Sequence, residues 1–126
     1  MKAALYILGD ADRVREHIER HLLAGELAEL AKLSERLSSG LNNLTCAAEE
    51  SLGAETIMAG GDDVLLRVRA DVFSAKALET IARTFRSETG CTISFGVGAD
   101  IAVAYLNLRR AKAGGGGTIV YPRGGE

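Results

Sequence analysis

Two short acidic motifs carry the side chains best suited to chemistry. Asp10 and Asp12 stand one residue apart after an apolar run, and the stretch GGDD occupies residues 60–63. Glycine and aspartate are ordinary hairpin residues, because they tolerate positive φ or form short side-chain turns. A tight turn needs the glycines, however, and does not need two adjacent carboxylates.

Carboxylates gathered at one point would call for a cation. At an effective dielectric constant of ~20, two unit charges about 5 Å apart repel by roughly 3 kcal/mol. Either some of the carboxyl groups take up protons, or a cation lies among them. Oxygen ligands without a softer partner favour Mg²⁺ or Mn²⁺ over Zn²⁺, and a magnesium ion held by few protein oxygens usually takes substrate phosphates as its other ligands. The motifs therefore indicate a site that handles phosphates.

Basic residues near the end of the sequence could hold such phosphates. Lys112 ends a predicted helix that starts at Asp100, and Arg109 lies one turn earlier. Twelve residues at about 1.5 Å each would bring Lys112 back about 18 Å towards the acidic motifs. The alternative for Lys112 is a structural one, since a cation at a helix C-terminus is favoured by the helix dipole. The glycines at 114–117 are equally open to two interpretations, a flexible turn or a phosphate-binding nest.

Other kinds of site find little support. His17 and His21 have a spacing that can bind metal, but no HExxH glutamate and no third ligand accompany them. Cys46 and Cys91 form no CxxC pair, which favours two buried, reduced thiols. No GxxxxGK[ST] motif is present, so the protein is not of the P-loop class.

Size and composition indicate one soluble domain over residues 1–126. Hydrophobic residues make up 47% of the 126, charged residues make up 25%, and the formal net charge is -2. This charge argues against sequence-independent nucleic-acid binding, so we expect no direct DNA binding. The apolar run from Ala3 to Leu8 is too short for a signal peptide or a membrane span, so we expect a cytoplasmic protein with no membrane association.

The hydrophobic pattern predicts the elements that must position the acidic motifs. Apolar spacing alternates between strand and helix periods in the order β-α-α-β-β-α-β-α-β, an α+β arrangement of the ferredoxin-like type. Gly40 interrupts the apolar stripe of the longest helix. The predicted elements are a strand at 3–8, helices at 11–25 and 27–52, hairpin strands at 55–59 and 64–69, a helix at 74–88, a strand at 92–97, a helix at 100–113, and a strand at 118–121 before a polar tail.

This order predicts where the carboxylates lie. Right-handed crossovers would put the first strand in the middle of the sheet, antiparallel to the second hairpin strand and to the strand at 92–97. The GGDD turn would then reach the edge of the sheet where the first strand ends. We therefore expect Asp62 and Asp63 to lie beside Asp10 and Asp12, so that four carboxylates meet. The alternative is that the turn directs Asp63 into solvent, in which case fewer charges meet.

Four motifs together carry a resemblance to a known family. They fall in the order found in the palm domains of GGDEF diguanylate cyclases and of type III CRISPR polymerases. The sequence resembles most closely the minimal CRISPR polymerase family, in which the palm stands alone, and the resemblance spans Ala3 to Tyr121. The motifs are GDADRV at 9–14, GGDD at 60–63, TISFGVGA at 92–99 and LRRAKAGGGG at 108–117.

The resemblance implies a nucleotidyltransferase that converts ATP, alone or with other nucleoside triphosphates, into a cyclic di- or oligonucleotide and releases pyrophosphate. A separate effector would read the product, in bacterial defence against phage. The resemblance implies that Asp10, Asp62 and Asp63 are catalytic and bind Mg²⁺ or Mn²⁺ together with the carbonyl of Ala11. Nucleotide-binding roles would fall on Asp12, Gly60, Gly61, Arg109 and Lys112.

Departures from the GGDEF pattern bear on the base. After the glycines the sequence has Asp-Asp-Val where the GGDEF pattern has Asp-Glu-Phe, and the helix after Asp12 lacks the FKxxND segment that GGDEF enzymes use in reading guanine. GGDD is the form of the CRISPR polymerases, which use ATP. The alternatives are a diguanylate or mononucleotide cyclase on the same palm, and a catalytically inactive ferredoxin-like nucleotide-binding module. Retention of the four acidic residues and Lys112 weighs against the inactive module.

A cyclic dinucleotide also bears on assembly. One palm with one acidic cluster offers one evident triphosphate site, whereas a cyclic dinucleotide needs two nucleotides and two bonds. A two-fold axis makes the two attacks equivalent, so we expect a homodimer.

Overall fold

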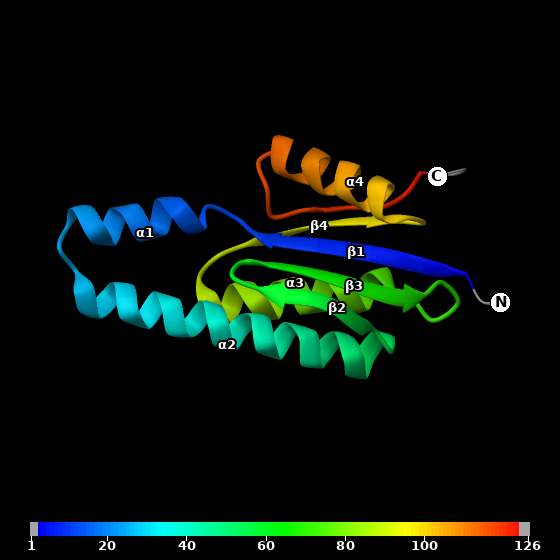
Figure 1. Ribbon diagram of the computed structural model, residues 1–126, viewed down its shortest axis with the longest axis horizontal. Helices are drawn as coiled ribbons and strands as arrows, with labels where there is room; N and C mark the ends of the chain where they lie inside the picture. The colour runs from blue at the N-terminus through cyan, green and yellow to red at the C-terminus, as the bar shows by residue number, and fades with distance from the viewer. Residues whose placement is uncertain (1–2, 124–126) are drawn as a thin grey trace.

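The computed structural model describes residues 3–123, which form a five-stranded sheet and four helices (Figure 1). The element order matches the predicted one, so the α+β arrangement is confirmed. The part of the predicted polar tail beyond Arg123 lies outside the described residues. In chain order the elements are β1 (Ala4–Ala11), α1 (Val14–Leu23), α2 (Leu27–Leu52), β2 (Glu55–Gly60), β3 (Asp63–Arg69), α3 (Ala75–Thr89), β4 (Ile93–Gly98), α4 (Ile101–Ala113) and β5 (Ile119–Val120).

The sheet has the strand order β2-β3-β1-β4-β5. As predicted, β1 lies in the middle and is antiparallel to both β3 and β4, while β5 joins the edge parallel to β4. The register places Asp10 opposite Asp63 on one side and opposite Ser94 on the other. The end of β1 is thus flanked by the start of β3 and the start of β4.

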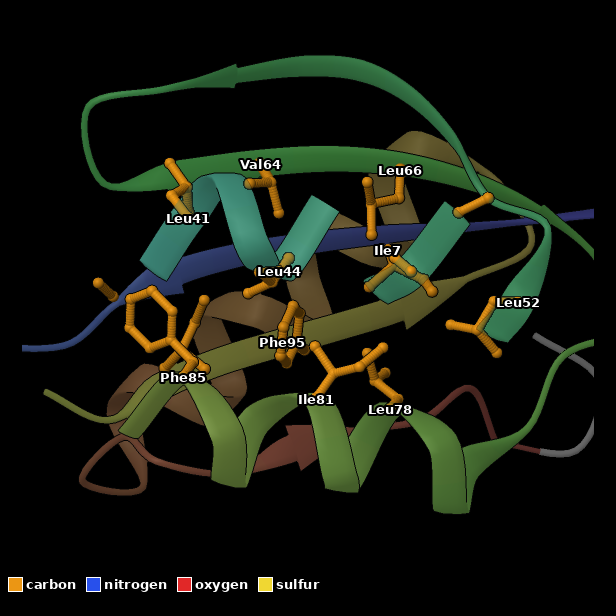
Figure 2. Close-up of a cluster of buried hydrophobic side chains, with 14 of the residues drawn as sticks. Ile7, Leu41, Leu44, Leu52, Val64, Leu66, Leu78, Ile81, Phe85 and Phe95 are labelled. Atoms are coloured by element: carbon orange, nitrogen blue, oxygen red, sulfur yellow. The ribbon is translucent and has the colours of Figure 1, made fainter. Parts of the chain in front are cut away.

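The main core lies between the sheet and the α2–α3 layer, and α4 covers part of the opposite face (Figures 1 and 2). Alternate residues of β3 are fully buried because strand side chains alternate between the two faces of a sheet. Figure 2 shows the side chains of both layers meeting: Ile7, Leu41, Leu44, Leu52, Val64, Leu66, Leu78, Ile81, Phe85 and Phe95.

Two glycines allow neighbouring elements to approach closely. A Cβ atom at Gly96 would collide with the backbone of Ala104 and Leu108, so glycine lets α4 lie directly on β4. This close packing fixes the direction in which α4 carries Lys112. A Cβ atom at Gly40 would collide with the side chain of Thr89, which explains glycine within α2. The helix continues through Gly40 without interruption.

The predicted boundary between the first strand and the first helix is wrong by about one turn. β1 continues past Leu8 because the N–H of Ala11 donates to the carbonyl of Asp62 at 2.8 Å, and the N–H of Asp12 donates to the carbonyl of Thr92 at 2.8 Å. These two bonds extend the sheet pairing to the point where the chain turns into α1. None of the described helices combines the length and the apolar character needed to cross a membrane.

Candidate functional site

Three aspartates meet at the end of β1. Asp10 lies near the end of this strand, Asp63 begins β3, and Asp62 lies in the turn before it. One carboxylate oxygen of each residue lies within 4.8 Å of the others, and among residues 3–123 this is the one such group of three or more potential metal ligands. Gly61 gives the turn its left-handed residue, with φ of 63°, a conformation that glycine adopts without strain.

The cluster carries unbalanced negative charge. Burial raises the pKa of Asp10, and the charges of Asp62 and Asp63 add to the rise, while the hydrogen bond and charge of Lys112 oppose it. The net direction is upward, so the single ammonium of Lys112 does not fully offset the burial and the two neighbouring carboxylates.

Lys112 reaches across from the last turn of α4 to this cluster. Its Nζ lies 3.1 Å from Asp10 Oδ2 and 2.7 Å from Asp12 Oδ1, and it donates to the carbonyl oxygens of Asp10 and Ala11, each at 3.1 Å. Four oxygens therefore surround one ammonium. The side chain returns to the acidic end of the sheet as the helix length predicts, and its role extends beyond that of a helix-end cation.

Asp12 does not join the three clustered aspartates, so the expectation that four carboxylates meet is wrong for this residue. Its side chain is buried, with 5% exposed, and is directed towards β4 instead. The hydroxyls of Thr92 and Ser94 donate to it at 2.7 and 2.8 Å, and the N–H of Gly117 donates at 2.8 Å. A buried carboxylate is stable only where such donors are available, and with Lys112 this side of β1 supplies four.

The electrostatics of Asp12 agree with a structural role. Burial by itself would raise the pKa of Asp12, but hydrogen bonds from Lys112, Thr92, Ser94 and Gly117 outweigh it and lower the pKa. The ionised carboxylate therefore ties β1 to β4, α4 and the loop before β5.

The tetraglycine segment is a turn whose N–H groups are already used. The N–H groups of Gly114, Gly115 and Gly116 donate to carbonyls of the last turn of α4, and that of Gly117 donates to Asp12 and Ser94. A phosphate nest needs free N–H groups, so the turn is the interpretation that the structure supports. A Cβ atom at Gly116 would lie 2.7 Å from Asp12 Oδ1, which explains why glycine stands there.

The remaining predicted residues are dispersed. Arg109 is exposed on α4, and within the described part of the chain no hydrogen bond or ion pair links it to the acidic cluster. His21 Nδ1 lies 3.1 Å from Glu26 Oε1 rather than in a metal site. Of the two cysteines, Cys91 is buried but Cys46 is exposed, which corrects the expectation of two buried thiols.

Two clefts flank α1, and sequence patterns did not reveal either. The first, of about 460 Å³, lies between α1 and α2 beside Gly61 and Asp62, and we call it the apolar cleft. The feature of the sequence that could have indicated this cleft is the series of apolar residues at the start of the long helix. That part of the helix extends with α1 beyond the sheet (Figure 1). Its other lining residues are Val14, Ile18, Leu30, Leu33, Ser34, Leu37 and Ser38.

The second cleft, of about 400 Å³, lies on another side of α1 and is polar. We call it the arginine cleft. It is enclosed by the start of α1, the end of α3 and the loop between α4 and β5. Its lining residues are Asp12, Arg13, His17, Arg86, Gly90, Thr92 and Gly115–Gly117.

Comparison with known proteins points to one family. Residues 6–121 match the family model described as the minimal CRISPR polymerase domain. No curated protein sequence shows a significant match.

Solved structures share the fold at low identity. A Csm1–Csm4 cassette in complex with cA4 has a TM-score of 0.75 and 19% identity, over 95% of this chain and 21% of the other. A Csm1–Csm4 cassette in complex with cA3 has a TM-score of 0.73 and 21% identity over the same shares. The chain thus spans about a fifth of the length of those matched chains. The active GGEEF domain of a diguanylate cyclase from Vibrio cholerae has a TM-score of 0.53 and 14% identity, over 95% of this chain and 83% of the other.

Proposed function

Because the chain belongs to the minimal CRISPR polymerase family, we propose that it is a metal-dependent nucleotidyltransferase that joins ATP, alone or with other nucleoside triphosphates, into a cyclic di- or oligonucleotide. The observation that carries this proposal is the group of three aspartates at the β1–β3 end of a palm fold. The ligands cA4 and cA3 of the similar Csm1–Csm4 cassettes support a product of that class. The product would be a signal read by a separate effector in defence against phage.

The donor set fits a hard divalent cation. Asp10, Asp62 and Asp63 offer oxygen only, with no thiolate or imidazole among them, which suits Mg²⁺ or Mn²⁺. These three residues would hold the ion, and the carbonyl of Ala11 would be a further ligand once Lys112 has left it. The ion supplies neutralisation of phosphate charge and a lower pKa for the attacking hydroxyl.

The protein's own groups are arranged to bind phosphates beside that ion. Lys112 carries its ammonium on a long side chain, so it can exchange the carbonyls of Asp10 and Ala11 for phosphate oxygens. The first turn of α1 has no side-chain cap, since Arg13 stands at the cap position and accepts no N–H with its side chain. Uncapped N–H groups at a helix N-terminus favour an anion such as phosphate.

The apolar cleft is suited to the base. Its volume falls in the range of small-molecule sites, and Asp62 lies both in its wall and in the acidic cluster. Ser34 and Ser38 are one turn apart on α2 and offer hydroxyls that can donate or accept. Besides Asp62, no carboxylate or amide side chain lines this cleft to accept the N–H groups of guanine. This composition supports adenine as the preferred base.

A homodimer would complete the reaction. The described residues contain one acidic cluster, and two bonds must form to close a cyclic dinucleotide. Two subunits related by a two-fold axis would each present a nucleotide hydroxyl to the α-phosphate held by the other.

The test is incubation of the purified protein with each nucleoside triphosphate and Mg²⁺ or Mn²⁺, followed by chromatography, mass measurement and nuclease digestion of the products. We expect ATP to give a cyclic product and GTP alone to give little. Asp62→Asn should abolish the product, whereas Asp71→Asn, an exposed change in the loop after β3, should not. Faster turnover of GTP than of ATP would favour the diguanylate cyclase alternative, and undiminished synthesis by Asp62→Asn would overturn the assignment of the site.

A further inference from the structure

The arginine cleft concentrates positive charge in a protein whose formal net charge is -2. Arg13, His17 and Arg86 line it, and across residues 3–123 no hydrogen bond or ion pair joins any of these three side chains to a carboxylate. The one carboxylate in its lining, Asp12, already has Lys112 at 2.7 Å. The cleft therefore offers a ligand the guanidinium groups of Arg13 and Arg86, neither of which is paired with a carboxylate of the described residues.

Arg13 is held in an unusual backbone conformation. Its φ of 57° and ψ of 29° are left-handed, and within the described residues it is the one non-glycine with positive φ. Glycine or asparagine would adopt this conformation more easily. Arginine in such a place indicates that its side chain is needed where the backbone directs it.

One segment of the cleft lining, Gly115–Gly117, carries no side chains. A Cβ atom at Gly116 would press against Asp12, while one at Gly115 would point into open space. The segment Gly115–Gly117 therefore contributes no side chain that would fill the cleft lined by the two arginines.

A continuous series of contacts links this cleft to the apolar cleft. Asp62 lines the apolar cleft and belongs to the acidic cluster with Asp10. Asp10 contacts Lys112, Lys112 contacts Asp12, and Asp12 lines the arginine cleft. A nucleotide with its base in the apolar cleft and its α-phosphate at the aspartates would direct the rest of its phosphate chain past Lys112 towards the arginine cleft.

We propose that the arginine cleft binds the β- and γ-phosphates of the nucleoside triphosphate and, after transfer, the pyrophosphate, an inference that rests on the proposed function. In the transfer the acceptor hydroxyl oxygen bonds the α-phosphorus, and the bond from that phosphorus to the bridging oxygen of the β-phosphate breaks. The bridging oxygen keeps the electron pair, and the hydroxyl proton passes to solvent. Arg13 and Arg86 present planar guanidinium groups, which match two phosphate oxygens each, and His17 adds a ring donor.

The structural alternative is that these are ordinary surface cations. Arg86 lies in the last turn of α3, where a cation is favoured by the helix dipole. If Arg86 served only the helix end, its substitution would lower the stability of the fold. The effect of the substitution on ligand affinity would then not depend on the number of phosphates in the ligand. The experiment should therefore compare ligands that differ in phosphate number.

Binding of pyrophosphate and of AMP to the full-length protein can be measured by calorimetry in the presence of a chelator. We expect Arg13→Gln and Arg86→Gln each to weaken pyrophosphate binding roughly tenfold, as loss of a charge-assisted contact implies. AMP binding should change less than about twofold, because its single phosphate would reach no further than Lys112. Arg15→Gln on α1 and Arg83→Gln on α3 are matched controls, since neither residue lines the cleft, and both should bind like wild type.

Arg13→Gly separates binding from folding. Glycine accepts the left-handed backbone, so this variant should melt no lower than wild type and still lose pyrophosphate affinity. Unchanged pyrophosphate affinity in Arg13→Gly and Arg86→Gln, or an equal loss for AMP and pyrophosphate, would overturn the assignment of the cleft. If wild type binds pyrophosphate in the expected pattern but makes no product from any nucleotide, the cleft assignment stands and the proposed function fails.

Discussion

Lys112 Nζ lies 3.1 Å from the carbonyl oxygen of Ala11, the backbone group that would be a ligand to a divalent ion. The same ammonium contacts Asp10 Oδ2 at 3.1 Å, so it takes up two of the oxygens that the ion would need. The protein thus carries a tethered cation where a metal and a phosphate chain are expected to meet. A bound metal would compete with the lysine for these oxygens, and a triphosphate would offer the lysine other partners.

This competition makes metal affinity the first quantity to test. Without nucleotide, Lys112→Met should bind Mn²⁺ more tightly than wild type, because it frees the Ala11 carbonyl and removes a positive charge beside Asp10. Arg109→Met removes a charge from the same helix without touching the cluster, and it should change the affinity much less. Mn²⁺ binding followed by electron paramagnetic resonance provides the comparison. Equal increases in the two variants would mean that the effect is one of net charge alone.

The pairing of Lys112 with Asp12 gives a prediction about stability. Lys112→Met leaves a carboxylate that is 5% exposed without its cation, and a lost hydrogen bond to a charged group costs about 1.5–3 kcal/mol. Denaturant unfolding should show this loss. The double variant Lys112→Met with Asp12→Asn removes the unpaired charge as well, so it should recover part of the stability while remaining defective in turnover. No recovery would indicate that Lys112 stabilises the fold through other contacts.

The fold could be predicted from the sequence because its signals are local and periodic. The alternation of apolar residues in β3 and their helical spacing in α2 and in α3 each identify an element, and right-handed crossovers then leave few ways to arrange the elements. The meeting of Asp10 with Asp62 and Asp63 follows from that arrangement.

The surroundings of the cluster could not be predicted in the same way. By its position in the sequence, Asp12 could have been a metal ligand like Asp10. Its side chain is instead directed away from the three clustered aspartates, because Thr92, Ser94 and Gly117 offer hydrogen bonds on the β4 side. Arg13 and Arg86 are 73 positions apart in the sequence, and no periodicity connects them. Tertiary packing determines which residues so far apart in the sequence lie close together, and no sequence motif predicts it.

Removal of one carboxylate should separate catalysis from folding. Asp62→Asn should abolish synthesis, whereas its free energy of unfolding without metal should be unchanged or higher, because one charge leaves a group whose members repel one another. Thermal melting with and without Mg²⁺ provides the measurement, and stabilisation by Mg²⁺ should be present in wild type and lost in the variant. A marked fall in the metal-free melting temperature would instead indicate that the Asp62 side chain stabilises the hairpin turn.

Occlusion of the apolar cleft should remove nucleotide binding and spare pyrophosphate. Ser38→Leu adds apolar volume at a residue that lines the cleft, whereas Ser39→Leu makes the same change at the next residue, which does not line it. We expect Ser38→Leu to weaken ATP binding by at least tenfold, with pyrophosphate affinity unchanged, and Ser39→Leu to match wild type. Equal ATP affinity in the two variants would place the base elsewhere.

Assembly can be tested through the dependence of rate on concentration. If two subunits are needed to close the ring, specific activity should fall as the protein is diluted below the dimer dissociation constant, and light scattering with a non-hydrolysable ATP analogue should detect the dimer. Addition of excess Asp62→Asn protein should then convert wild type into mixed dimers. In a mixed dimer one intact acidic cluster can form one bond, so linear dinucleotide should accumulate while the cyclic product declines. Constant specific activity in a species shown to be monomeric, with no linear product in the mixture, would require that one subunit hold both nucleotides.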